Sequence, residues 1–190
     1  MLLLVGLGNP GSSYTNTRHN IGFKIIDAIN AHFKLSKQKP KFKGLLTTGN
    51  IDEKKIYAIK PLTFMNNSGT AIKELIDYFK IDAKDVFVFH DDMDIDFGKI
   101  KAKFGGSSAG HNGIESIDKF IGKDYSRVRI GIGHPKVKKK VNNHVLEDFK
   151  EDEEEKINEI TENIVKQLPT LIEKKIDLFS SKVNQDLNGI

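Results

Sequence analysis

Leu2-Leu-Leu-Val-Gly6 opens the chain and runs directly into Leu7-Gly-Asn-Pro-Gly11. Four consecutive apolar residues ended by a glycine predict a strand that is buried on both faces. Val86–Phe89 has the same character, and segments with helical periodicity lie between the two. Strands that alternate with helices predict an α/β fold, a single domain with a twisted, mixed β-sheet flanked by helices on both faces.

The remaining elements follow from the spacing of apolar residues. Helical spacing predicts helices over residues 21–33, 70–80 and 113–121, and Ser68 is placed to cap the second of them. Apolar or alternating runs predict strands over residues 45–50, 56–60, 99–104 and 127–132, the first two forming a hairpin. We expect loops at residues 34–43 and 133–141, and C-terminal helical segments interrupted near Pro169.

The segment Gly6–Gly11 also matches the G-x-G-x-x-G pattern of dinucleotide-binding proteins, and Asp27 follows at a suitable distance. That pattern holds a pyrophosphate only when a helix opens at the third glycine. Here a polar stretch follows, helical periodicity begins only near Ile21, and Asp27 falls inside that helix. We therefore expect the loop to bring Asn9 close to a different group, with a dinucleotide-dependent enzyme as an alternative.

The distribution of charge points to a polyanionic partner. The net charge is +4, but basic residues outnumber acidic ones up to Leu146, and acidic residues outnumber basic ones from Glu147 onward. A basic body of this kind attracts a polyanion such as nucleic acid. The alternative is a lysine-rich surface that is simply solvated.

The absence of cysteine excludes disulfides, thiol catalysis and zinc–cysteine sites. No apolar run reaches the roughly 18 residues of a membrane helix. The apolar run at Leu2–Val5 is also too short for the core of a signal peptide. We therefore expect a cytoplasmic protein with no membrane contact.

Two histidines stand in polar settings just before predicted helices. His19 lies in Thr17-Arg-His-Asn20, and His111 lies in Gly110-His-Asn-Gly113. Asp91 follows a buried strand directly, so its carboxylate is expected at the edge of the sheet. A carboxylate beside an imidazole fixes its tautomer and raises its basicity, which makes a neutral histidine a useful base near pH 7. Read alone, either histidine is more typical of a surface loop.

Three asparagines lie in predicted turns, namely Asn9, Asn66 and Asn112. Asparagine often occupies turns for backbone reasons alone, and that interpretation holds for each of them singly. If the three turns converge, their amides would fix a carbonyl group and orient a water molecule.

The segment His90–Asp96 offers a metal-binding alternative, because clustered carboxylates and an imidazole can hold Mg²⁺ or Mn²⁺. The segment lacks the glycine and the terminal glutamate of a calcium loop. Asp94 and Asp96 also suit an ordinary turn before the next strand. We therefore expect no obligatory metal and no cofactor.

Basic side chains recur along single faces of two predicted strands, a layout that suits contacts with phosphate groups. Few aromatic residues lie between them, so base stacking is poorly supported. The basic residues are Lys99, Lys101 and Lys103 on one strand, Arg127 and Arg129 on another, and a basic loop at residues 136–140.

Taken together and in order, these motifs resemble the bacterial-type peptidyl-tRNA hydrolase family. Each motif is weak alone, but the ordered set is specific and spans residues from about 1 to about 146. The matching segments are Gly6–Gly11, Tyr14, Thr17–Asn20, Pro61–Asn66, Ser68-Gly69, His90–Asp94, Gly105-Gly106, Gly110–Gly113 and Arg127–Pro135.

The resemblance implies a monomer that hydrolyses the ester joining a peptide to the 3′ end of tRNA, and so recycles tRNA from stalled translation. The 3′ end would lie in a cleft and the phosphates on the basic surface. His19 would be the base that activates water, with Asp91 as its partner and Asn9 in the catalytic centre. The implied substrate-binding residues are Asn66 and Asn112 for the peptide and the reacting carbonyl, Met65 and Tyr14 for the cleft wall, and Lys103 and Arg129 for the 5′ phosphate.

The chemistry suits these residues, because an ester requires only a water, a base and stabilisation of the oxyanion. The serines lack the setting of a serine-hydrolase nucleophile. A non-catalytic RNA-binding protein with the same basic surface is the alternative, but it leaves His19, Asp91 and the three asparagines unexplained.

The sequence departs from the family pattern where Ala109, Lys136 and Glu147 replace frequent glycines. Ala109 matters only if that position needs a positive φ. The other two fall in residues 134–150, a lid-like region over the cleft in relatives, which precedes the helices expected at residues 151–180.

Overall fold

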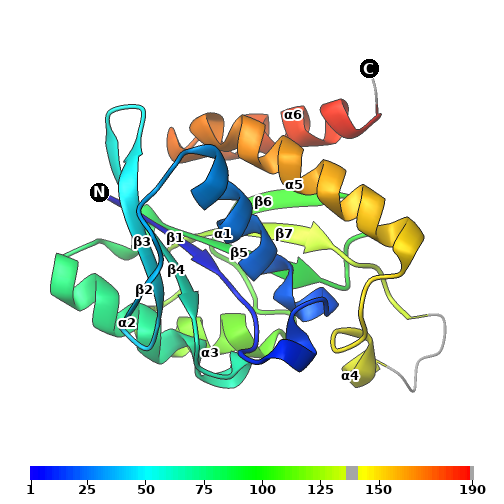
Figure 1. Cartoon of the computed structure of the whole chain (residues 1–190), viewed down its shortest axis with the longest axis horizontal. Helices are drawn as coiled ribbons and strands as arrows, with labels where there is room; N and C mark the ends of the chain where they lie inside the picture. Colours follow the sequence, from blue (N-terminus) through cyan, green and yellow to red (C-terminus); the bar gives the residue numbers. More distant parts are fainter. Residues whose placement is uncertain (136–140, 189–190) are drawn as a thin grey trace.

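The computed structural model describes residues 1–135 and 141–188 and places β1 (Leu2–Gly6) in the middle of a seven-stranded sheet (Figure 1). The other strands are β2 (Lys39–Lys41), β3 (Gly44–Ile51), β4 (Lys54–Pro61), β5 (Val86–Asp92), β6 (Ile100–Phe104) and β7 (Ser126–Gly131). Their order is β2-β3-β4-β1-β5-β7-β6. The central strands β4, β1, β5 and β7 are parallel, while β2, β3 and β6 pair antiparallel with their neighbours. The predicted mixed sheet is confirmed.

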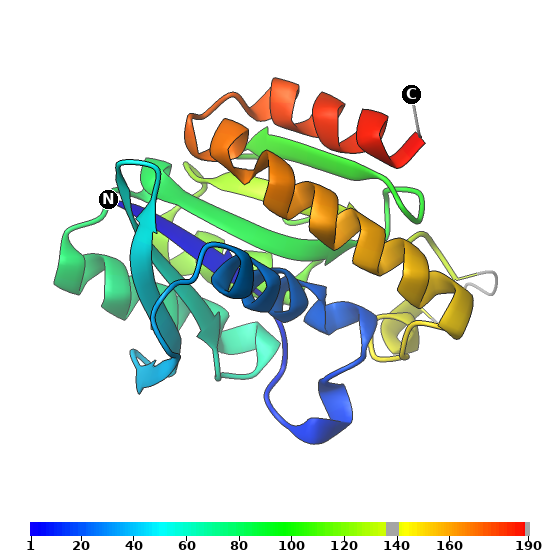
Figure 2. The same cartoon turned by 45° about the horizontal axis from the view of Figure 1, so that its top comes forward.

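Helices cover both faces of the sheet (Figure 2). One face carries α1 (Ile21–His32), α5 (Glu151–Ile172) and α6 (Ile176–Asn188), the other carries α2 (Ser68–Phe79) and α3 (Asn112–Ile121), and α4 (Val141–His144) is a short helix before α5. Along β1, Leu2 and Leu4 belong to the first core, whereas Leu3 and Val5 belong to the second. An uninterrupted apolar run is therefore what this strand requires.

The carboxyl ends of the parallel strands meet at one edge of the sheet, where ligands bind in folds of this kind. Gly6 at the end of β1 pairs with Phe89 of β5, so the two strands end side by side. The loops that carry Asn9 and Met65 leave from this edge, and Asp91 lies there near the end of β5. The topology thus brings together residues that lie far apart in the sequence.

The glycine-rich loop after β1 serves the packing of α1. A Cβ at Gly6 would collide with the carbonyl group of Gly22, and a Cβ at Gly22 would collide with the backbone of Leu7. These two glycines allow α1 to cross close to the end of β1. Gly11 is followed by a short 3-10 turn and α1 begins only at Ile21, so the loop does not open a helix as a dinucleotide site requires.

Two expectations about local structure were wrong. Residues 39–41 form the edge strand β2 instead of a loop, and an edge strand tolerates Pro40 because one side of its backbone has no partner strand. Ser68 does not cap α2. It is the first helical residue, its hydroxyl donates to the carbonyl of Met65 at 2.9 Å, and Asn67 occupies the cap position.

The C-terminal helices break at a different place from the one predicted. Helix α5 continues through Pro169, and the break comes at residues 173–175, where Lys174 has a φ of 64°. None of the described helices is both long and apolar enough to cross a membrane. The basic loop expected at 136–140, which includes Lys136, lies outside the described residues.

Ala109 lies in the loop before α3 and has a φ of 49°. Residues with a Cβ rarely adopt this left-handed conformation, because the Cβ crowds the neighbouring carbonyl group. The replacement of a frequent glycine at this position therefore does carry a structural cost.

We predict that Ala109→Gly raises the free energy of unfolding by about 0.5–1 kcal/mol, because relief of left-handed strain exceeds the added flexibility of glycine in the unfolded chain. Urea denaturation measures the change. Ala28→Gly, in the middle of α1, is the control and should lower the free energy of unfolding by about 1 kcal/mol. Loss of stability in both variants would contradict the strain at residue 109.

Candidate active site

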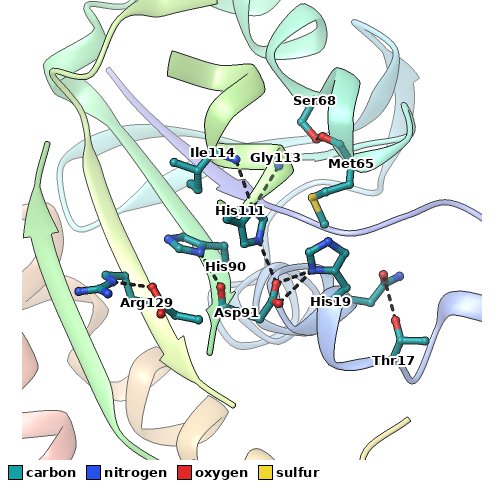
Figure 3. Close-up of polar contacts among 12 residues, drawn as sticks. Thr17, His19, Met65, Ser68, His90, Asp91, His111, Gly113, Ile114 and Arg129 are labelled. Carbon is teal, nitrogen blue, oxygen red and sulfur yellow. Dashed lines mark hydrogen bonds and ion pairs between the residues drawn. The ribbon is translucent and has the colours of Figure 1, made fainter. Parts of the chain in front are cut away.

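Asp91 lies at the end of β5, fully buried, and its carboxylate connects two separate loops (Figure 3). His19 Nδ1 lies 2.8 Å from Oδ1 and 3.0 Å from Oδ2, and His111 Nε2 lies 3.0 Å from Oδ1. Burial alone would raise the pKa of Asp91, but the two imidazoles outweigh it and hold that pKa far below its ordinary value. Asp91 is therefore an anion at the centre of the site.

His19 reaches Asp91 because it lies in the 3-10 turn immediately before α1, which packs over the end of β1. Its backbone N–H donates to the carbonyl of Val145 at 2.8 Å. With Nδ1 donating to Asp91, Nε2 carries the lone pair and points away from the carboxylate (Figure 3). Burial alone would lower the pKa of His19, but the charge and the hydrogen bond of Asp91 raise it above its ordinary value.

His111 is held on both sides of its ring, which fixes its tautomer. It precedes α3, and its Nδ1 accepts the N–H groups of Gly113 at 3.1 Å and Ile114 at 3.3 Å. Nε2 must therefore carry the proton and donate it to Asp91. The sequence marks His111 as unusual, but the role inferred from the family pattern fell on its neighbour Asn112. The contact with Asp91 depends on the tertiary fold.

His90 lies behind His111, with the two ring centroids 4.8 Å apart. Its Nδ1 donates to the backbone carbonyl of Asp91 at 2.7 Å. Burial lowers the pKa of His90 well below its ordinary value. His90 is therefore a neutral, buried residue that packs against His111.

The metal-binding alternative can be compared with this geometry. In the part of the chain that the structure describes, His19, Asp91 and His111 form the group whose ligand atoms come close enough for an ion, within 4.8 Å of one another. Direct hydrogen bonds already join these three side chains. The segment His90–Asp96 contributes only Asp91 to this group. The histidine and carboxylates of that segment therefore do not come together as the metal site that the sequence suggested.

Asn9 directs its side-chain amide into the same cleft. Its Oδ1 accepts the backbone N–H of Met65 at 2.8 Å, which leaves the Nδ2 donor for the cleft. The side chain of Asn20 fixes the backbone of Asn9, since it accepts from the N–H and donates to the carbonyl, each at 2.9 Å.

A cavity of about 670 Å³ lies above these groups. Its walls combine amides with apolar side chains, and the sequence-predicted residues among them are Asn9, His19, Met65, Asn66, Asp91 and Asn112. Phe64, Met93, Val145 and Leu146 provide apolar surface. Tyr14, which was also expected in the cleft wall, is not among the lining residues.

The predicted phosphate-binding residues separate into two groups. Lys103 of β6 and Arg129 of β7 are half-buried outside the cavity, and Arg129 Nε donates to Asp92 at 2.7 Å. Burial, and then the positive charges of Arg129 and Arg127, lower the pKa of Lys103. Arg127 is buried and pairs with Asp118 at 2.7 Å, so the prediction that it contacts phosphate was wrong.

Known proteins share both the sequence and the fold. The sequence profile of the family described as peptidyl-tRNA hydrolase matches residues 3–189. The peptidyl-tRNA hydrolase of Pelagibacter ubique is 72% identical over 184 residues, covering 97% of this chain and 99% of the relative. That of Ehrlichia ruminantium is 46% identical over 181 residues, covering 95% and 93%.

Among solved structures, peptidyl-tRNA hydrolase from Acinetobacter baumannii superposes with a TM-score of 0.90 at 34% identity, covering 97% of this chain and 94% of that chain. The similarity to these proteins thus extends along nearly the whole chain, which includes the seven-stranded sheet and the residues of the cleft at its edge. The chain belongs to the peptidyl-tRNA hydrolase family.

Proposed function

We propose that His19 is the general base with which this chain, a peptidyl-tRNA hydrolase, cleaves the ester between peptide and tRNA. The observation that carries the proposal is the bond from His19 Nδ1 to the buried Asp91 carboxylate, which leaves Nε2 as a proton acceptor beside the cavity. Family membership supports the substrate.

In the reaction, Nε2 of His19 takes a proton from a water molecule while the water oxygen attacks the carbonyl carbon of the ester. The tetrahedral intermediate then collapses, the 3′ oxygen of tRNA leaves with the proton held by the imidazolium, and the peptide departs as a carboxylic acid that ionises. Asp91 stays ionised and stabilises the imidazolium between these steps. His111 Nε2 donates a further hydrogen bond to Oδ1 of Asp91.

The amides around the cavity would hold the ester. Asn9 Nδ2 offers a donor toward the developing oxyanion, and its orientation is set by Met65 and Asn20. Asn66 and Asn112 are exposed on the cavity wall, where they would bind the peptide and the reacting carbonyl. Tyr14 lies outside the described cavity wall and has no role in this proposal.

Lys103 and Arg129 would bind the 5′ phosphate of tRNA. Besides burial, the positive charges of Arg129 and Arg127 lower the pKa of Lys103, and an incoming phosphate would offset this repulsion. We also propose that the chain acts as a cytoplasmic monomer, with residues 134–150 as a lid-like region and the helices that follow as part of the same domain.

We predict that His19→Ala lowers kcat by at least about 10²-fold, because general-base catalysis contributes about 10²–10⁴-fold. Release of peptide from peptidyl-tRNA is measured with and without EDTA. His32→Ala, an exposed histidine at the end of α1, should retain the wild-type rate. Near-normal turnover of His19→Ala, or loss of wild-type activity in EDTA, would contradict the proposed mechanism.

The pH dependence of kcat/KM provides a second prediction. A base acts only when deprotonated, so kcat/KM should fall as the pH drops through the raised pKa of His19, which lies above 6.5. Asp91→Asn removes the interactions that raise this pKa and leaves the effect of burial, so the acid limb should move to lower pH and the plateau should fall. An unchanged midpoint in Asp91→Asn would argue against the pairing.

We predict that Lys103→Gln raises KM for peptidyl-tRNA and leaves kcat nearly unchanged, because the phosphate contact is remote from the ester. The slope of log KM against log salt should become shallower by about one. Lys37→Gln, an exposed residue between α1 and β2, is the control of equal charge. Equal effects in both variants would show that only net charge matters.

A further inference from the structure

Two segments that lie far apart in the sequence pair backbone to backbone beside the active site. Asn16–His19 and Val145–Phe149 run antiparallel, and we call this pairing the clasp. Its hydrogen bonds join His19 N–H to the Val145 carbonyl at 2.8 Å, Arg18 N–H to the Glu147 carbonyl at 3.1 Å, and Phe149 N–H to the Asn16 carbonyl at 3.3 Å. One of the two segments of the clasp thus ends at His19.

The side chain of Arg18 fills the centre of the clasp and is only 3% exposed. Its Nη1 donates to the carbonyl groups of Glu147 at 3.1 Å and Asp148 at 2.8 Å, and its Nη2 donates to Glu153 Oε2 at 2.7 Å. The guanidinium carbon lies 5.4 Å from the centre of the Phe149 ring. A planar fork of donors can reach two carbonyl groups and a carboxylate at once, which a lysine ammonium cannot do with the same geometry.

Glu153 fixes the clasp to α5. Besides Arg18, its carboxylate accepts the backbone N–H of Lys150 at 2.8 Å and so caps the first turn of the helix. Arg18 is therefore connected to both the 145–149 segment and the long helix that follows it.

The clasp contributes residues to the wall of the cleft. Val145 and Leu146 line the same cavity as Asn66 and Asn112, and the Val145 carbonyl is the acceptor for the backbone of His19. Any movement of the 145–149 segment therefore changes both the apolar wall and the position of the imidazole. Arg18 itself is not among the residues that line the cavity.

We propose that Arg18 is a positioning residue that holds His19 in register with the Val145–Leu146 wall, with Glu153 as its counter-ion. This proposal rests on His19 being the base. Misplacement of a catalytic group by about 1 Å can cost about 10²-fold in rate. The effect should fall on kcat, because the proposed phosphate contacts at Lys103 and Arg129 lie elsewhere and maintain KM.

The test compares Arg18→Met with Lys24→Met. Lys24 forms an equally direct bridge between α1 and α5, to Glu154 at 2.6 Å, but takes no part in the clasp. Arg18→Met should lower kcat at least tenfold with KM within threefold of wild type, and should speed hydrogen exchange at the His19 amide. Lys24→Met should keep kcat within twofold.

A second variant covers the case in which Arg18→Met does not fold. Glu153→Gln keeps the arginine and removes the charge of its partner, and it should lower kcat by about threefold or more with KM unchanged. Wild-type kcat in a folded Arg18→Met or in Glu153→Gln, or an equal loss in Lys24→Met, would overturn the proposal. If His19→Ala stays active, the assignment of the base fails instead, which separates the two outcomes.

Discussion

The structure depends most on the burial of one anion, the carboxylate of Asp91. A carboxylate inside a protein is costly unless opposite charges or hydrogen-bond donors satisfy it. Here two imidazoles supply those donors, one from the loop before α1 and the other from the loop before α3. The same contacts that make the burial tolerable also set the tautomer and basicity of His19. The burial of Asp91 and the proposed role of His19 therefore depend on one set of hydrogen bonds.

Close packing of α1 against the end of β1 brings the donor of His19 to Asp91. Gly6 and Gly22 allow α1 to approach the end of β1, so the turn before α1 arrives at the edge of the sheet. The sequence around Gly6 has the appearance of a nucleotide-binding loop, yet its glycines serve contact between helix and strand. Residues 145–149 pair with the same turn, and Val145 and Leu146 of this segment line the cleft. The acidic first turn of α5 also contacts basic residues, because Glu153 pairs with Arg18 and Glu154 pairs with Lys24.

Much of this arrangement could be predicted, because it follows from local pattern. The run Leu2–Val5 requires two covered faces, and the pair His19 and Asp91 follows from the family resemblance together with the chemistry of a base. The hydrogen bond between His19 and Asp91 could not be predicted from the sequence, because it depends on how the two segments pack in the fold. The role of His111 and the burial of Arg127 were not predictable, because each depends on partners distant in sequence. Backbone angles pose the same problem, as at Ala109, where composition alone gives no φ.

The cap that His111 places on α3 limits where a proton can go. Its Nδ1 lone pair accepts two helix N–H groups, so it is not available to another donor. His90 is sealed in the core and stays neutral. His19 and His111 contact the Asp91 carboxylate and His90 contacts the Asp91 backbone carbonyl, and of these three rings His19 carries the lone pair that we propose faces the substrate. Under the proposed mechanism, each turnover therefore uses a single ring nitrogen, Nε2 of His19, through which the proton enters and leaves.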